Sequence, residues 1–409
     1  MSFPELLETA LAGTPDARTL LRDAGLEGLR WLAGRIPDIA EPQAEFEYSA
    51  QEDRAEVPQA ATARLVDILT RRIDALPEWL ELVRERGLRL PPNVLPDVLD
   101  FGCEQRASLR ELILDSGGAR MVWLSKHNSQ WSFAAYANPE DQFRWGPRED
   151  RELALRRIRR RAPDRGRELL RADLRSERGD NRVRLLAALE VGLSSMDEDV
   201  LQRAIGDARR EVRETALRLM RLLPESQWAT RWTQRATSAL GQSGDPSVQA
   251  DWEADGMDGH APEDVQWRQL VAFTPPRLWP AHMLDVFVRR QPLLAGLAEA
   301  AAAYQDPVWC TRLILASVAG MDVRRLFRAL DEQAATELLR TLVHSDTQKH
   351  GSTLATLLRE APWSVDPRLA PELDTFLGQD LAPMWLRPAL VHLVDTLDYR
   401  LGMRRELDG

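Results

Sequence analysis

The chain has 409 residues, of which 44% are hydrophobic and 29% charged, a composition typical of a globular protein and unlike that of a disordered or fibrous one. At roughly 150 residues per domain, this length predicts two to three domains or one extended repeat array. The net charge of -10 argues against a protein that coats nucleic acid over its whole surface.

Leucine recurs at helical spacing along most of the chain, and this pattern predicts an all-α protein. The first change of composition lies at residues 37–58, where seven acidic residues stand against a single arginine, and we interpret this stretch as an exposed loop. We interpret residues 130–145, which are aromatic and broken by Pro139, as an ordered loop. The predicted helices cover residues 77–86, 92–104, 107–115, 148–161, 164–174 and, near the end, 388–405.

The clearest repeat unit covers residues 194–224. Ser195 and Glu198 have the spacing of a capping box, which predicts the start of a helix that Gly206 ends. Asp207 can cap a second helix. The apolar stripe of that second helix consists of Val212, Ala216, Leu219, Met220 and Leu223. One such hairpin cannot bury both of its faces, so neighbouring hairpins must stack on it, and we expect an αα-hairpin solenoid or superhelix with acidic loop insertions.

A second acidic stretch, residues 241–264, contains seven acidic residues and no lysine or arginine, and we interpret it as an exposed loop or linker. It divides the chain into an amino-terminal helical region, 1–240, in which the repeats are clearest at 148–224, and a carboxy-terminal helical region, 265–409.

Several segments together resemble an uncharacterised bacterial family of HEAT-like helical proteins, a domain of unknown function. The matching segments are 76–80 (LPEWL), 86–92 (RGLRLPP), 123–131 (WLSKHNSQW), 163–170 (PDRGRELL) and 197–224. The resemblance implies a HEAT-like fold, in which Asp207 and Arg213 would bond between neighbouring repeats. It also implies genomic company, because members are often encoded beside MoxR-type AAA ATPases, von Willebrand A-domain proteins and SWIM zinc-finger proteins. It implies no catalytic residues.

Elements of catalytic and metal sites are scarce. There is no GxSxG nucleophile elbow and no phosphate-binding glycine loop, since Gly117 and Gly118 lack the Walker lysine. His344, Asp346 and His350 are the most metal-like cluster, but their spacing is not that of a helical zinc site. We therefore expect no enzymatic activity, no cofactor, no metal site and no small-molecule substrate.

Two further features bear on the cellular compartment in which the protein resides. Cys103 and Cys310 lie far apart in sequence, which leaves no disulfide framework and fits a reducing cytoplasm. The first residues lack the pattern of a signal peptide, and no stretch of about 18 apolar residues predicts a membrane span.

The densest charge feature is the segment 147–184, with 14 arginines against 8 acidic residues. One interpretation is a solvated helix face in which ion pairs form one turn apart. The other is a binding surface for an acidic protein partner, with nucleic acid as the second choice. The candidate partner-binding residues are Arg156, Arg157, Arg160, Arg161, Arg165 and Arg167.

The pattern as a whole favours a non-enzymatic HEAT-like scaffold or adaptor for protein–protein interaction, with a MoxR-type AAA ATPase system as the lead from the resemblance. The alternative is a HEAT-like nucleic-acid-binding protein, or a DNA glycosylase-like enzyme, that uses the arginine-rich segment 148–184.

Overall fold

Amphipathic helices pack in pairs through most of the chain, because each buries a stripe of leucine, alanine and tryptophan against its neighbours. The computed structural model describes residues 8, 12–13, 17–33, 49, 51–174, 176–241, 250–318, 320–345, 347–379 and 382–408. These residues contain helices and no strand beyond a single bridge between Glu56 and Arg89. The prediction of an all-α protein built from helical hairpins is confirmed.

The chain forms two compact units, Met1–Ala50 and Gln51–Gly409. Unit 1 contains helix α2 (Ala17–Ala33), on which Leu21, Leu26 and Leu29 are exposed. All other described helices belong to unit 2, which carries both hydrophobic cores.

The first half of unit 2 holds eleven α-helices among its described residues. They are α3 (Gln59–Arg71), α4 (Leu76–Glu85), α5 (Leu95–Gly102), α6 (Ala107–His127), α7 (Pro139–Trp145), α8 (Arg151–Arg161), α9 (Pro163–Asp173), α10 (Gly179–Ala187), α11 (Glu198–Ile205), α12 (Arg210–Arg221) and α13 (Gln227–Gly241). Short 3-10 turns precede or extend several of them, as at η3 (Ser129–Ala134).

The second half continues in the same manner. Its α-helices are α14 (Ala250–Ala254), α15 (Glu263–Phe273), α16 (Met283–Val288), α17 (Gln291–Ala303), α18 (Pro307–Ala316), α19 (Val323–Arg328), α20 (Glu332–Val343), α21 (Thr347–Leu357), α22 (Ala370–Gly378) and α23 (Arg387–Asp408). The turns η8 (Ala361–Trp363) and η9 (Pro367–Leu369) connect α21 to α22.

Two predictions in the first half need correction, that of a loop at 130–145 and that of a helix end at Asp115. Residues 130–145 are not an ordered loop, because η3 and α7 occupy most of them, with Pro139 at the first position of α7, where its missing N–H costs nothing. The helix predicted to end at Asp115 continues as α6 to His127. It does so across a kink at Gly118, whose φ of 71° and ψ of -169° favour glycine.

Within the acidic stretch 37–58, which we interpreted as an exposed loop, residues 37–48 and 50 lie outside the described part. The rest of the stretch is exposed only in part. Val57 is buried, and Arg54 donates to the carbonyl of Asp115 at 2.6 Å. Glu52 accepts a hydrogen bond from the N–H of Ala119 at 3.0 Å, directly after the kink. This segment therefore fastens the start of unit 2 to α6.

The repeat unit 194–224 forms the predicted hairpin of α11 and α12. Its capping box is shifted by one residue, because Ser194 and Asp197 form it instead of Ser195 and Glu198. Glu198 instead accepts hydrogen bonds from the N–H groups of Gln227 and Trp228 in the next hairpin. The residues of the apolar stripe that are fully buried are Val212, Ala216, Leu219 and Met220.

The larger hydrophobic core runs from Phe143 to Leu397 and crosses the segment that we interpreted as a linker. Residues 242–249 lie outside the described part, but Trp252 and Met257 beyond them are buried. Asp255 is 4% exposed and pairs with Arg231 and Arg235 of α13. The described part of the acidic stretch 241–264 is therefore anchored in the core.

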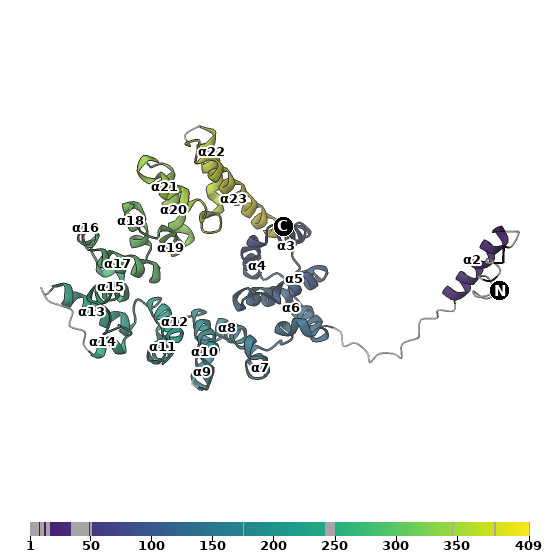
Figure 1. Ribbon diagram of the computed structural model, residues 1–409, viewed down its shortest axis with the longest axis horizontal. Coiled ribbons are helices and arrows are strands. Elements are labelled where there is room, and N and C mark those ends of the chain that lie inside the picture. Colours follow the sequence, from purple (N-terminus) through teal and green to yellow (C-terminus); the bar gives the residue numbers. More distant parts are fainter. Residues whose placement is uncertain are drawn as a thin grey trace. The chain divides into compact units, whose positions relative to one another are not determined.

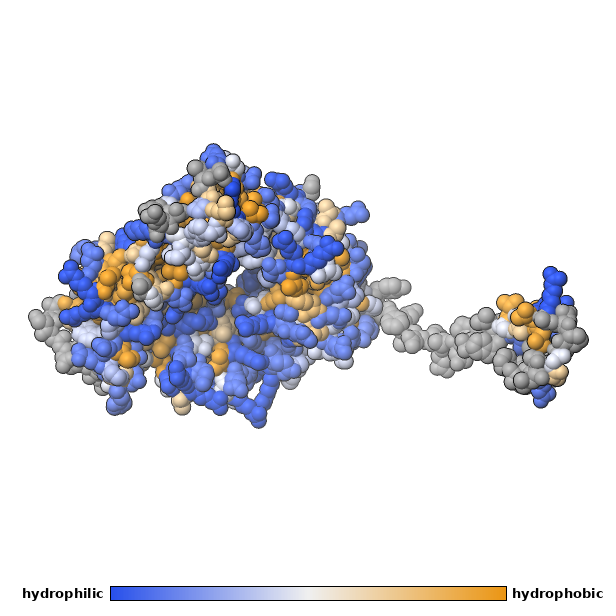
Figure 2. All heavy atoms as spheres, turned by 45° about the horizontal axis from the view of Figure 1, so that its top comes forward, coloured by the Kyte–Doolittle hydropathy of each residue, from blue (hydrophilic) through white to orange (hydrophobic). Residues whose placement is uncertain are grey.

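Helix α23 joins the two ends of unit 2. Its first half contributes Leu390, Leu393 and Leu397 to the larger core, and its second half contributes Met403 and Leu407 to the smaller core around α3 and α4. Figure 1 shows the helices of unit 2 following one another around a closed circuit, with α23 returning beside α3. We call the contact of α23 with α3 and α4 the closure interface. In Figure 2, hydrophilic side chains cover most of the visible face of this unit.

Candidate functional site

The arginine-rich segment folds into α8, α9 and α10, and its most buried arginine is Arg159. Its guanidinium is fully buried and pairs with the equally buried Asp197 at 2.8 Å. It also donates to the carbonyls of Leu189 and Val191, at 3.1 and 2.7 Å. Gly166 of α9 faces this side chain, and a Cβ atom there would lie 2.3 Å from Cγ of Arg159. Arg159 thus joins α8 to α9 and α11 as a structural residue.

Arg156 and Arg160 are held by Glu111 of α6. Their Nε atoms donate to its two carboxylate oxygens at 3.0 and 2.8 Å, and the Glu111 side chain is 1% exposed. The hydrogen bond to Glu111 raises the pKa of Arg160. Burial, together with the nearby Glu111, raises the pKa of Asp115, the next carboxylate of α6. Two of the six predicted partner-binding residues therefore neutralise a buried acid.

The other four predicted residues have different surroundings. Arg157 donates to the side chain of Gln142 at 3.1 Å, and burial lowers its pKa. Arg165 pairs with Glu140 at 3.1 Å, and Arg167 is buried beside Asp197. Arg161 is exposed and has neither an ion pair nor a hydrogen bond among the described residues. The six arginines therefore do not form a continuous unpaired surface, because most of them bond to side chains of the same fold.

A hollow of about 470 Å³ lies where the hairpin of α9 and α10 meets that of α11 and α12. Leu174, Val200, Ala204 and Val212 give it an apolar lining. The arginines that line it are Arg171, Arg182 and Arg203, one from each of α9, α10 and α11. Two of these belong to the arginine-rich segment, whereas Arg203 lies outside it.

The three arginines differ in how far they are neutralised. Arg171 approaches Asp199 at 3.5 Å, an exposed pair of little strength. Arg182 pairs with Asp207 and donates to the carbonyl of Glu177 at 3.1 Å. Arg203 is exposed and makes no ion pair or hydrogen bond within the described residues. The hollow consequently has an excess of positive charge.

Of Asp207 and Arg213, the pair expected to bond between repeats, Asp207 bonds to the preceding hairpin and Arg213 bonds within its own. Asp207 accepts from Arg182 of the preceding hairpin and from the N–H of Arg209 at 2.9 Å. Burial acts to raise the pKa of Asp207, but these two donors hold it below its ordinary value. Arg213 donates to the carbonyls of Asp207 and Ala208, within its own hairpin, at 2.9 and 3.0 Å.

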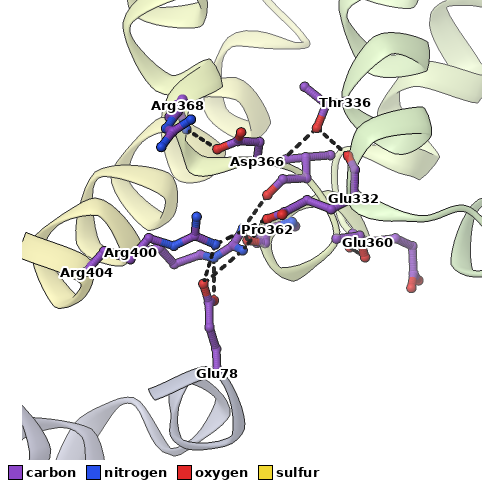
Figure 3. Close-up of polar contacts among 11 residues, drawn as sticks. Glu78, Glu332, Thr336, Glu360, Pro362, Asp366, Arg368, Arg400 and Arg404 are labelled. Atoms are coloured by element: carbon purple, nitrogen blue, oxygen red, sulfur yellow. Dashed lines mark hydrogen bonds and ion pairs between the residues drawn. The ribbon is translucent and has the colours of Figure 1, made fainter. Parts of the chain in front are cut away.

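The closure interface holds a network of four charged residues, which we call the closing network: Glu78 of α4, Glu332 of α20, and Arg400 and Arg404 of α23. Figure 3 shows both arginines reaching from α23 to Glu78. Arg400 is 2% exposed and donates to Glu78 at 2.5 and 3.1 Å. Its remaining nitrogen donates to the carbonyls of Pro362 and Val365, at 2.8 and 2.6 Å.

Further polar contacts extend the closure interface along α23. Arg64 of α3 pairs with Glu406 at 2.5 Å, and its guanidinium lies over the ring of Tyr399, 4.4 Å from the centroid. The hydroxyl of Tyr399 donates to Asp67 at 3.0 Å. Charged groups thus surround the apolar contact that Met403 and Leu407 make with the smaller core.

The remaining sequence candidates do not converge on a site. Cys103 is half-buried and contacts two carbonyls, and burial raises the pKa of its thiol. His344 lies edge-on to Phe376, whereas His350 is buried against Ser317, and Asp346 lies outside the described residues. In the part of the chain that the structure describes, no three metal-ligating side chains come together, and no helix has the length and apolar character needed to cross a bilayer.

Sequence reasoning missed Arg203 and the closing network. Arg203 carries no distinguishing signal, since it is one arginine in an ordinary helix. Glu78 lies in the LPEWL segment, but nothing in the sequence relates it to Arg400, which is 322 residues away. The hint of a buried charge there is that Arg400 occupies the helical stripe of α23 that also contains Leu393, Leu397 and Met403.

A model of a family of unknown function, DUF5691, matches residues 2–373. The chain belongs to this family. The match ends within α22, so that α23 lies beyond it. No curated protein and no solved structure matches the chain significantly.

Proposed function

We propose that the protein is a non-enzymatic scaffold of HEAT-like helical hairpins, which binds a partner protein on a framework closed into a ring. The closure interface carries this proposal. It combines a two-sided apolar contact of α23 with a buried arginine–carboxylate pair, and it removes the freedom of an open helical array to bend. A rigid framework binds with a smaller loss of conformational entropy.

The resemblance supplies a lead for the partner, namely a MoxR-type AAA ATPase system. The nucleic-acid alternative loses support because Arg156, Arg159 and Arg160 are committed to buried carboxylates. A guanidinium whose charge and N–H groups already bind an internal carboxylate binds a phosphate only weakly.

The test is affinity purification of the tagged protein from cells that make it, with partners identified by mass spectrometry. Glu78→Lys places a third cation beside Arg400 and Arg404 and should open the ring. Glu85→Lys makes the same charge change at an exposed position of the same helix and is the matched control. We expect the wild type and Glu85→Lys to recover the same partner, and Glu78→Lys to recover much less of it. Equal recovery with Glu78→Lys, in a sample whose far-ultraviolet circular dichroism is unchanged, contradicts the role of the closed ring.

A further inference from the structure

Two arginines of the arginine-rich segment, Arg171 and Arg182, line the hollow between the two hairpins together with Arg203. The lining contains Arg171, Arg182 and Arg203 against one carboxylate, that of Asp207. Asp207 is already engaged by Arg182 and by a backbone N–H, so it does not neutralise the other two arginines. The whole chain, by contrast, has a net charge of -10.

The apolar part of the lining adds a second requirement. Val200, Ala204 and Val212 form a buried apolar floor, and the apolar lining residues that reach solvent are the half-buried Leu174 and the exposed Ala208. Contact with an apolar group would remove the exposed surface of Leu174 and Ala208 from water, at about 25 cal/mol per Å². A ligand that satisfies the whole site therefore carries carboxylates beside an aliphatic or aromatic side chain.

The acidic surface around the hollow favours binding of a short anion over binding of a long one. At about 0.15 M salt the Debye length is roughly 8 Å, so a short acidic segment would feel the three arginines and little of the remote acidic surface. A long polyanion would extend past the hollow and meet that surface. The guanidinium group also matches the geometry of a carboxylate, to which it can donate two parallel hydrogen bonds.

We infer that this hollow is the docking site for a linear acidic segment of the partner protein, in which glutamate or aspartate residues flank a leucine or phenylalanine that enters the apolar part. The inference rests on the proposed scaffold function and locates its binding surface. Arg203 and Arg171 bind the flanking carboxylates. Arg182, held by Asp207, fixes the edge of the hollow.

Direct binding tests this inference with defined probes. A fluorescein-labelled peptide, Glu-Glu-Leu-Phe-Glu-Glu, is titrated with the full chain and followed by fluorescence anisotropy at 0.05 and 0.15 M salt. Two further peptides separate the contributions: Glu-Glu-Ser-Ser-Glu-Glu lacks the apolar side chains, and Lys-Lys-Leu-Phe-Lys-Lys reverses the charge. We expect the first peptide to bind at least tenfold more tightly than either of the others, and more tightly at the lower salt concentration.

Three variants assign the binding to the hollow. Arg171→Glu with Arg203→Glu should weaken binding of the first peptide at least tenfold. Ala208→Trp, at an exposed position of the lining, should fill the apolar part and weaken binding while leaving every charge in place. Arg210→Glu, at an exposed position of α12 outside the lining, is the matched control and should leave binding unchanged.

The outcomes separate this inference from the proposed function. Equal weakening by Arg210→Glu, or no binding of the acidic peptide at millimolar protein, overturns the docking site, whereas partner recovery in the purification experiment would still support the scaffold. A single-stranded oligonucleotide that binds more tightly than the peptide, and loses binding in the Arg171 and Arg203 variant, overturns the peptide in favour of nucleic acid. Selective binding of the acidic apolar peptide that depends on Arg203 and Ala208 supports the inference.

Discussion

Buried guanidinium groups connect distant parts of this chain at the scale of single residues. Arg159 meets Asp197 and Arg400 meets Glu78, and in each pair the two residues come from different helical elements. A charged group that leaves water needs both an opposite charge and partners for its other hydrogen atoms. Backbone carbonyls meet that second need around both arginines.

Removal of the Asp197 carboxylate should leave the buried charge of Arg159 without its opposite charge. We expect Asp197→Asn to lower the free energy of unfolding by about 3–5 kcal/mol, the usual cost of breaking a buried pair from one side. Urea denaturation followed by circular dichroism measures it. Asp199→Asn, two residues away and 72% exposed in its side chain, is the control and should change stability by less than about 1 kcal/mol. Similar values for the two variants would contradict the structural role of Arg159.

Asp255 makes stability depend on pH. Burial acts to raise the pKa of Asp255, but its contacts with Arg231 and Arg235 outweigh burial and lower it. A carboxylate whose pKa is lowered by folding stabilises the protein above its unfolded pKa of about 3.9, and this contribution fades as the pH falls through the folded value. Asp255→Asn should therefore be less stable than the wild type at pH 7, and the difference should shrink below about pH 4. A difference that stays constant down to pH 3 in urea denaturation would rule out this contribution.

Hairpin packing is decided at the scale of the element. The sequence pattern of α11 and α12 predicts the hairpin and its buried stripe, because helical periodicity and the glycine stop at Gly206 agree over 194–224. Where helical periodicity is weak, the sequence did not predict the helical turns or the buried residues. At 130–145 short helical turns follow Asn and Pro residues rather than a periodic stripe, and the buried Trp252 stands inside an acidic segment whose average composition conceals it.

Ala216 is the place where a larger side chain should disrupt stacking. It is fully buried on α12, so Ala216→Arg would both overpack the contact between hairpins and bury an unpaired charge. We expect a loss of several kcal/mol in the free energy of unfolding, seen as a large drop in melting temperature, in a protein whose far-ultraviolet circular dichroism is strongly helical. Glu214→Arg introduces the same group at an exposed position of the same helix and should have little effect. An unchanged melting temperature for Ala216→Arg would contradict the repeat assignment.

The whole molecule depends on contacts that sequence periodicity does not encode. Local patterns predicted several helices of unit 2, among them the hairpin at 194–224, but not the closure interface, because it pairs residues more than 300 positions apart. The arginine-rich segment shows the same limit. Its net charge is visible in the sequence, but which arginines serve buried acids depends on tertiary packing with Glu111 of α6 and Asp197 before α11.

The closure interface should make α3, α4 and α23 open as one cooperative unit. In hydrogen exchange followed by mass spectrometry, we expect Glu78→Ala to accelerate exchange in all three helices together, because Arg400 loses its main carboxylate partner. Exchange in α11 and α12 should stay at wild-type rates. Acceleration confined to α4 alone would mean that α23 is held independently of the closing network.

Open arrays of helical repeats usually need capping repeats, whose outer faces are polar, because the first and last repeats would otherwise expose one apolar side to water. In unit 2 the second half of α23 covers the apolar side of α3 and α4, and these helices cover α23 in return. Each end of the array therefore serves as the cap of the other. The order of helices around the circuit then matters more than the point at which the chain starts, so a circular permutant of this unit should keep the same fold.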